Sequence, residues 1–151
     1  MRKVFSITAE IISGIFILLF FYTAISKLMT YQSFRTVLSM SPAIGKYADL
    51  LAWFLPAVEL VTVALLFIPR TKSLGLTFSL ALMLLFTGYI FYMLQSGLHL
   101  PCSCGGVLKH MSWKQHLLFN TSFTVIAVLG LLLQQRSKNF IAINRSSRIP
   151  V

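Results

Sequence analysis

The chain has 151 residues, of which 57% are hydrophobic and only 11% are charged, and its formal net charge is +10. Soluble proteins carry roughly 25% charged residues, so this composition excludes an ordinary soluble globule and indicates one integral membrane domain in a lipid bilayer. The basic residues lie between apolar runs and in the C-terminal tail, as membrane-topology signals do. We therefore expect no nucleic acid among the partners.

Four apolar runs are long enough to cross a bilayer, which requires about 20 residues of helix. The predicted spans cover about 7–26, 50–68, 74–94 and 113–133. We predict an all-α fold, an integral membrane four-helix bundle within residues 1–134. A basic tail follows at 135–151. The first run is longer than the apolar core of a signal peptide and no clean cleavage site follows it, which favours a retained helix.

The first loop carries two local signals. Phe34, Val37 and Leu38 recur at helical spacing, which predicts a short amphipathic helix on the outer membrane surface. Ser41 followed by Pro42 is typical of an N-cap with proline at the first helical position. We therefore expect the second span to be preceded by a helix start at Ser41.

The distribution of basic residues predicts the topology. Four spans place both termini on one side, and that side collects most of the basic residues: Arg2, Lys3, Arg70, Lys72, Arg136, Lys138, Arg145 and Arg148. The positive-inside rule then places the termini in the cytoplasm and the two long loops outside. We predict a multi-pass protein of the cell inner (cytoplasmic) membrane, whose third loop is periplasmic or extracellular.

That third loop holds the only two cysteines of the chain, Cys102 and Cys104. A disulfide between residues two apart closes a small, strained ring, and strained exposed disulfides are usually labile or catalytic. Gly105 and Gly106 give the backbone the freedom that such a ring needs. Because the loop faces an oxidising compartment, a disulfide can persist there. We favour redox function over a static bridge or two unpaired thiols.

A metal site is a third interpretation of the same loop. His99, Cys102, Cys104 and His110 supply two nitrogens and two sulfurs, the ligands that zinc prefers. Structural zinc sites, however, usually separate their cysteines by two to four residues, and one intervening residue suits a tetrahedral chelate poorly. We therefore predict no metal at this loop and keep the metal site as the less favoured alternative.

Glu59 interrupts the second apolar run about 13 Å from its outer end, at about 1.5 Å per residue. A carboxyl group at that depth is energetically costly and usually faces the bundle interior with a partner. Lys27, at the outer end of the first span, is the nearest cationic candidate. Glu59 is either a proton-accepting or quinone-contacting group, or one half of a buried pair that fixes helix packing.

The fourth run begins with a polar stripe. Ser112 and Gln115 match a capping box that starts the helix. His116, Asn120 and Thr124 then recur every four residues and so share one face. The stripe either joins helices through hydrogen bonds, as polar residues do in membranes, or lines a path for protons, or holds the polar head of a quinone. Glu59, His116 and Asn120 are therefore the candidate cofactor-binding residues, and a quinone is the candidate cofactor.

These residues together resemble the MauE group of the DoxX-like membrane proteins over about Ile7 to Leu133. The matching features are the basic residue closing the first span (Ser26-Lys27-Leu28), the acidic residue in the second (Ala57-Val58-Glu59-Leu60) and the loop Pro101-Cys102-Ser103-Cys104-Gly105-Gly106. The family form of the loop is Cys-x-Cys-Phe-Gly, and the phenylalanine is absent from this chain.

The resemblance implies a redox-associated membrane protein. MauE proteins are associated with the maturation of methylamine dehydrogenase, particularly of its disulfides, alongside a thioredoxin-like partner. We therefore expect a thiol–disulfide oxidoreductase in which Cys102 and Cys104 are catalytic and the partner is a thioredoxin-like extracytoplasmic protein. The alternative is a non-catalytic membrane scaffold subunit of a redox complex, with the cysteines as a local loop staple.

Overall fold

The computed structural model describes residues 2–95 and 112–146 of the chain. Its helices are α1 (Arg2–Met29), α2 (Tyr31–Ser39), the short 3-10 helix η1 (Gly45–Tyr47), α3 (Ala48–Phe67), α4 (Lys72–Gln95) and α5 (Trp113–Ser146). In this part of the chain, four helices are long and apolar enough to cross a membrane: Ile7–Met29, Gly45–Phe67, Lys72–Gln95 and Lys114–Arg136. The predicted all-α membrane bundle is confirmed.

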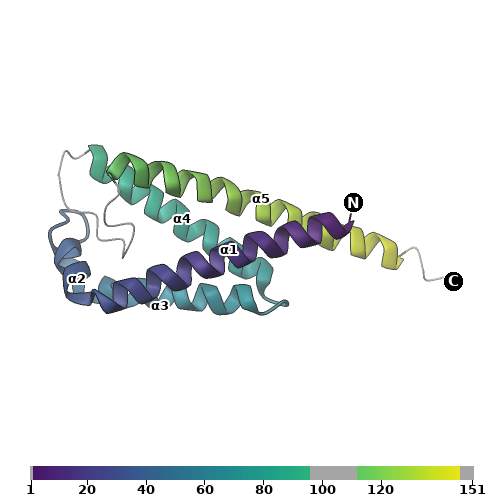
Figure 1. Cartoon of the computed structure of the whole chain (residues 1–151), viewed down its shortest axis with the longest axis horizontal. Coiled ribbons are helices and arrows are strands. Elements are labelled where there is room, and N and C mark those ends of the chain that lie inside the picture. Colours follow the sequence, from purple (N-terminus) through teal and green to yellow (C-terminus); the bar gives the residue numbers. More distant parts are fainter. Residues whose placement is uncertain (1, 96–111, 147–151) are drawn as a thin grey trace.

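The four long helices form one bundle in which each helix has two main neighbours. α1 packs against α3 and α5, and α4 packs against α5 and α3, so that α1 and α4 lie on a diagonal. Both termini and the α3–α4 turn lie at one end, here called the terminal end (Figure 1). The opposite end, which holds α2, the end of α4 and the start of α5, is called the α2 end (Figure 1).

Close helix packing at the terminal end begins at Gly75 in α4. A Cβ atom on Gly75 would lie 2.8 Å from the backbone nitrogen of Leu66 in α3, so only glycine permits this approach. Beside it, Lys72 pairs with Glu10 of α1 at 2.5 Å. The apolar core continues inward from there as a cluster of buried side chains: Ile12, Phe16, Phe20, Leu66, Leu76, Leu82, Met83 and Ala127.

The short helix predicted for the first loop is confirmed as α2, whereas its position on the membrane surface stays a prediction. Its apolar side chains Phe34 and Leu38 are buried and pack against Ala48 and Ala52 of α3. The predicted helix start at Ser41 is wrong. Ser41 lies in a turn in which its carbonyl accepts from the amide of Gly45 at 2.8 Å, and α3 begins only at Ala48, since packing of α2 on α3 requires the chain to reverse first.

α5 begins as predicted and ends later than predicted. The Ser112 amide donates to Gln115 Oε1 at 2.9 Å and the Gln115 amide donates to Ser112 Oγ at 3.3 Å, which is the reciprocal pattern of a capping box. The helix continues past Leu133, the expected end of the span, to Ser146. Residues 134–146 contain neither glycine nor proline, so nothing in the sequence interrupts the helix where the apolar run stops.

Candidate functional site

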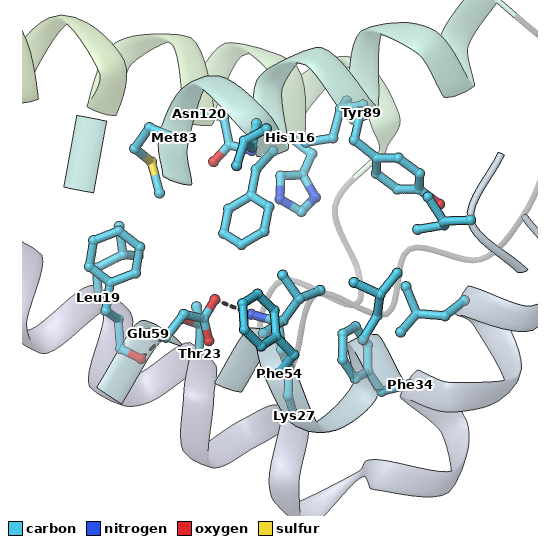
Figure 2. Close-up of a pocket in the computed structure, with 18 of the residues that line it drawn as sticks. Leu19, Thr23, Lys27, Phe34, Phe54, Glu59, Met83, Tyr89, His116 and Asn120 are labelled. Atoms are coloured by element: carbon cyan, nitrogen blue, oxygen red, sulfur yellow. Dashed lines mark hydrogen bonds and ion pairs between the residues drawn. The ribbon is translucent and has the colours of Figure 1, made fainter. Parts of the chain in front are cut away.

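A cavity of about 340 Å³ lies inside the bundle near the α2 end. All four long helices and α2 contribute to its wall, which is mostly apolar. Its polar side chains are few and are held on two opposite walls, as Figure 2 shows. The polar lining residues are Thr23, Lys27, Glu59, Tyr89, His116 and Asn120. An apolar chamber with a few convergent polar groups is the usual form of a small-molecule site.

One wall carries a buried ion pair between α1 and α3. Lys27 Nζ lies 2.5 Å from Glu59 Oε1, and the two side chains are 5% and 0% exposed. The ammonium group also lies 5.9 Å from the ring centroid of Phe34 and 5.4 Å from that of Phe86, within the range of cation–π attraction. The sequence-based choice of Lys27 as the partner of Glu59 is therefore confirmed.

One of the two carboxylate oxygens of Glu59 lacks a hydrogen-bond partner in the described part of the chain. Its Oε1 accepts from Lys27, but its Oε2 accepts no hydrogen bond from any residue in the described part of the chain. An ionised carboxylate accepts at both oxygens, and a buried polar atom without a partner is rare and energetically costly. Glu59 lines the cavity. Oε2 has almost no accessible surface, so the carboxylate forms part of the wall without presenting this oxygen to the chamber.

The opposite wall comes from the first two turns of α5. His116 and Asn120 are 3% and 4% exposed and face Lys27 and Glu59 across the cavity (Figure 2). The predicted stripe therefore reaches the site with two of its three members. Thr124 is not part of the lining, and its hydroxyl donates to the backbone carbonyl of Asn120 at 2.8 Å.

Several lining residues gave no signal in the sequence analysis. Thr23 lies one turn before Lys27 on α1, and its hydroxyl donates to the Phe20 carbonyl at 3.2 Å. Spacing of four residues from Lys27 could have placed it on the same face. Tyr89 of α4 and Phe54 of α3 read as ordinary membrane-span residues, because only the packing of the helices determines that they line the cavity.

Cys102 and Cys104, predicted to be catalytic, lie outside the described residues, as do His99 and His110. The segment that holds them joins Gln95, the last residue of α4, to Ser112, which caps α5, and both of these residues lie at the α2 end. Within the described ranges, no group of three or more His, Cys, Asp or Glu residues is placed to hold a metal ion. Chain connectivity thus brings both ends of the cysteine segment to the end of the bundle that contains the cavity.

A third ion pair joins α2 to the start of α3. Arg35 pairs with Asp49 on the outer surface, where both side chains are exposed, and the bound carboxylate raises the pKa of the Arg35 guanidinium. The chain has only three acidic residues, and each of them, Glu10, Asp49 and Glu59, contacts a basic side chain of another helix. Only the Lys27–Glu59 pair is buried on both sides, which distinguishes it from the two others.

These features define a multi-span α-helical membrane protein with a charged, ligand-sized chamber at one end of its bundle. The family model for methylamine utilisation protein MauE matches residues 5–133, and the chain belongs to the MauE family. Neither a curated protein nor a solved structure matches the chain. The family match includes Lys27, Glu59, both cysteines and the α5 residues of the cavity.

Proposed function

We propose that this MauE family member is a membrane thiol–disulfide redox protein that acts with a thioredoxin-like extracytoplasmic partner in disulfide formation or protein maturation. Cys102 and Cys104 are the exchanging pair. The observation that carries the proposal is the position of the charged cavity. The last turns of α4 and the first turns of α5 contribute Tyr89 and His116 to it, and the cysteine segment directly connects these two helices.

The exchange step requires only the two cysteines and a dithiol partner. A thiolate of the partner attacks the Cys102–Cys104 disulfide, which gives a mixed disulfide and releases one cysteine as a thiolate. The second thiolate of the partner then displaces the other cysteine. The partner leaves with a disulfide and this chain retains two thiols, so two electrons have moved to it. In the inner membrane, with cytoplasmic termini, the pair would meet such partners outside the cytoplasm.

The cavity fits a quinone as the acceptor of those electrons. Bound there, a quinone would supply two-electron, two-proton chemistry. Lys27, whose ammonium group carries three protons and gives one to Glu59 Oε1, would donate a hydrogen bond to a carbonyl oxygen of the head. Asn120 and His116, on the facing wall, add groups that orient a planar polar head. Glu59 would hold and return a proton.

The test uses the full chain reconstituted in lipid vesicles that contain ubiquinone, with reduced thioredoxin supplied as the dithiol donor. We expect the unaltered protein to reduce ubiquinone. The double variant Cys102→Ser/Cys104→Ser should reduce ubiquinone no faster than vesicles without protein do. Ser103→Ala is the matched control, because it alters the same loop without removing a thiol. A thioredoxin variant that lacks its second cysteine should accumulate a mixed disulfide with the oxidised, unaltered protein, which dithiothreitol releases, and should form none with either single cysteine variant, because neither variant has a disulfide to attack.

Glu59→Gln separates the two halves of the proposal. It should slow quinone reduction and leave formation of the mixed disulfide unchanged, since the exchange step uses only the cysteines. Equal rates for the double cysteine variant and the unaltered protein would refute the thiol role and favour the scaffold alternative. Stoichiometric zinc or copper in the purified protein, lost in the same double variant, would favour the metal alternative.

A further inference from the structure

We infer that the cavity exchanges its ligand laterally with the bilayer, through an opening between α3 and α4 at Phe54 and Leu85. The ligand then has a compact polar head and a long apolar tail, and the tail leaves the bundle between these two side chains. This inference rests on the proposed quinone site. It adds the route by which the ligand enters the cavity and the part of the ligand, its tail, by which the protein selects it.

The exposure of the lining residues locates the opening. Among the described residues that line the cavity, all except two are buried or partly buried. The two exceptions are Phe54, which is 57% exposed, and Leu85, which is 68% exposed. They belong to neighbouring helices. A residue that lines the chamber and is also exposed on the surface lies where the chamber meets the surface. The chamber therefore opens between α3 and α4.

The course of α4 explains why the opening lies there. α3 and α4 touch at the terminal end, where Gly75 lies against the backbone of Leu66. From that contact the two helices diverge toward the α2 end, as Figure 1 shows. Leu85 is ten residues further along α4, about 15 Å from Gly75 at 1.5 Å per residue. The separation is therefore wide enough at Leu85 for the cavity to reach the surface.

The opening faces lipid and not water. Phe54 and Leu85 both lie within the membrane-spanning segments. The surrounding surface consists of exposed apolar side chains, among them Leu50, Val61 and Leu84. A water-soluble ligand would have to cross hydrocarbon to enter there, whereas a lipid-soluble one diffuses in the bilayer up to the opening.

The size of the chamber determines which part of the ligand it holds. An apolar cavity of about 150 Å³ holds one benzene ring. The 340 Å³ available here therefore accommodates a head of one or two rings beside Lys27 and Glu59. A long apolar tail cannot fit as well. It has to leave through the opening, where Phe54 and Leu85 would contact its first units.

The experiment uses the full chain in lipid nanodiscs with a ubiquinone analogue that carries a photoreactive diazirine at the start of its tail. After irradiation, mass spectrometry locates the labelled residues. We expect labelling at Phe54 and Leu85 that unlabelled long-tailed ubiquinone prevents. Leu84 is an exposed leucine that does not line the cavity. It should be labelled only to the extent that the probe in the lipid contacts it, and unlabelled ubiquinone should not reduce that labelling.

A pair of variants tests the opening itself. Leu85→Trp narrows it, and Leu84→Trp adds the same bulk to the lipid-facing surface one residue away. We expect Leu85→Trp to slow saturable labelling about tenfold, which corresponds to an added barrier of about 1.4 kcal/mol. Leu84→Trp should label at the unaltered rate. Thermal unfolding of both variants verifies that each one is folded.

The outcomes distinguish the route from the site. Competed labelling on α1 or α5, or equal rates for the two tryptophan variants, would overturn the lateral route while leaving a quinone site in place. Labelling that no quinone prevents would overturn the quinone site, and the inference with it. Labelling of Phe54 and Leu85 that long-tailed but not tail-less quinone prevents would establish the opening as the determinant of selection.

Discussion

The buried Lys27–Glu59 pair provides the sharpest test of how this bundle is held together. Replacing either residue with methionine keeps most of the side-chain volume and removes one charge. The single variants Lys27→Met and Glu59→Met each leave the other charge inside a mostly apolar chamber, whereas the double variant leaves none. The pair joins α1 to α3, so its loss affects the packing of two of the four long helices.

The expected magnitudes follow from the burial of both groups. Removing one partner of a buried ion pair costs about 3–5 kcal/mol, because the remaining charge is uncompensated. Replacing both partners with apolar residues of similar volume is often neutral or stabilising. We therefore expect each single variant to lose about 3–5 kcal/mol of unfolding free energy, and the double variant to be more stable than either single variant.

The assay is reversible unfolding of the purified chain in mixed micelles with increasing fractions of a denaturing detergent, followed by far-ultraviolet circular dichroism. The matched control is the exposed pair, in which Arg35→Gln and Asp49→Asn should change stability too little to resolve because solvent screens it. If the double variant loses the sum of the two single losses, Lys27 and Glu59 are not coupled, and the reasoning fails.

Two further predictions concern packing and capping, and unfolding in the same micelles measures both. Gly75→Ala should destabilise the bundle by about 1–3 kcal/mol through overpacking against the backbone of Leu66, whereas Gly88→Ala, with nothing within 4 Å of the added methyl group, should be neutral or stabilising. Ser112→Ala should cost about 1 kcal/mol, because it removes the hydroxyl that accepts from the Gln115 amide; an unchanged stability would mean that the start of α5 is held by other contacts.

The sequence predicted those features that depend on local chemistry or on a strong energetic rule. The membrane spans follow from apolar length alone, and α2 follows from the spacing of Phe34 and Leu38. The pairing of Lys27 with Glu59 was predictable because a carboxyl group inside a membrane requires a partner and few cations lie at that depth. The convergence of His116 and Asn120 with Glu59 followed from helix periodicity and depth. Their roles toward a ligand stay predictions.

Features that depend on long-range packing were not predictable. Ser41 and Pro42 have the local pattern of an N-cap, but the packing of α2 on α3 requires a turn there. The length of an apolar run also predicts where a helix leaves the bilayer, but it does not predict where the helix ends. The polar continuation of α5 was therefore not predicted. Phe54 and Leu85 look like any lipid-facing residues until the divergence of α3 and α4 is known.

α4 lies against α3 at Gly75, so a change in the tilt of α4 rotates the helix about that contact. Leu85 lies about 15 Å from Gly75 along the helix, so each degree of tilt moves Leu85 by about a quarter of an ångström. Membrane-spanning helices adjust their tilt to the thickness of the hydrocarbon layer. At the inferred opening between α3 and α4, the thickness of the surrounding bilayer would control access to the chamber: a physical property of the lipid, and not a ligand, would set how readily the site fills.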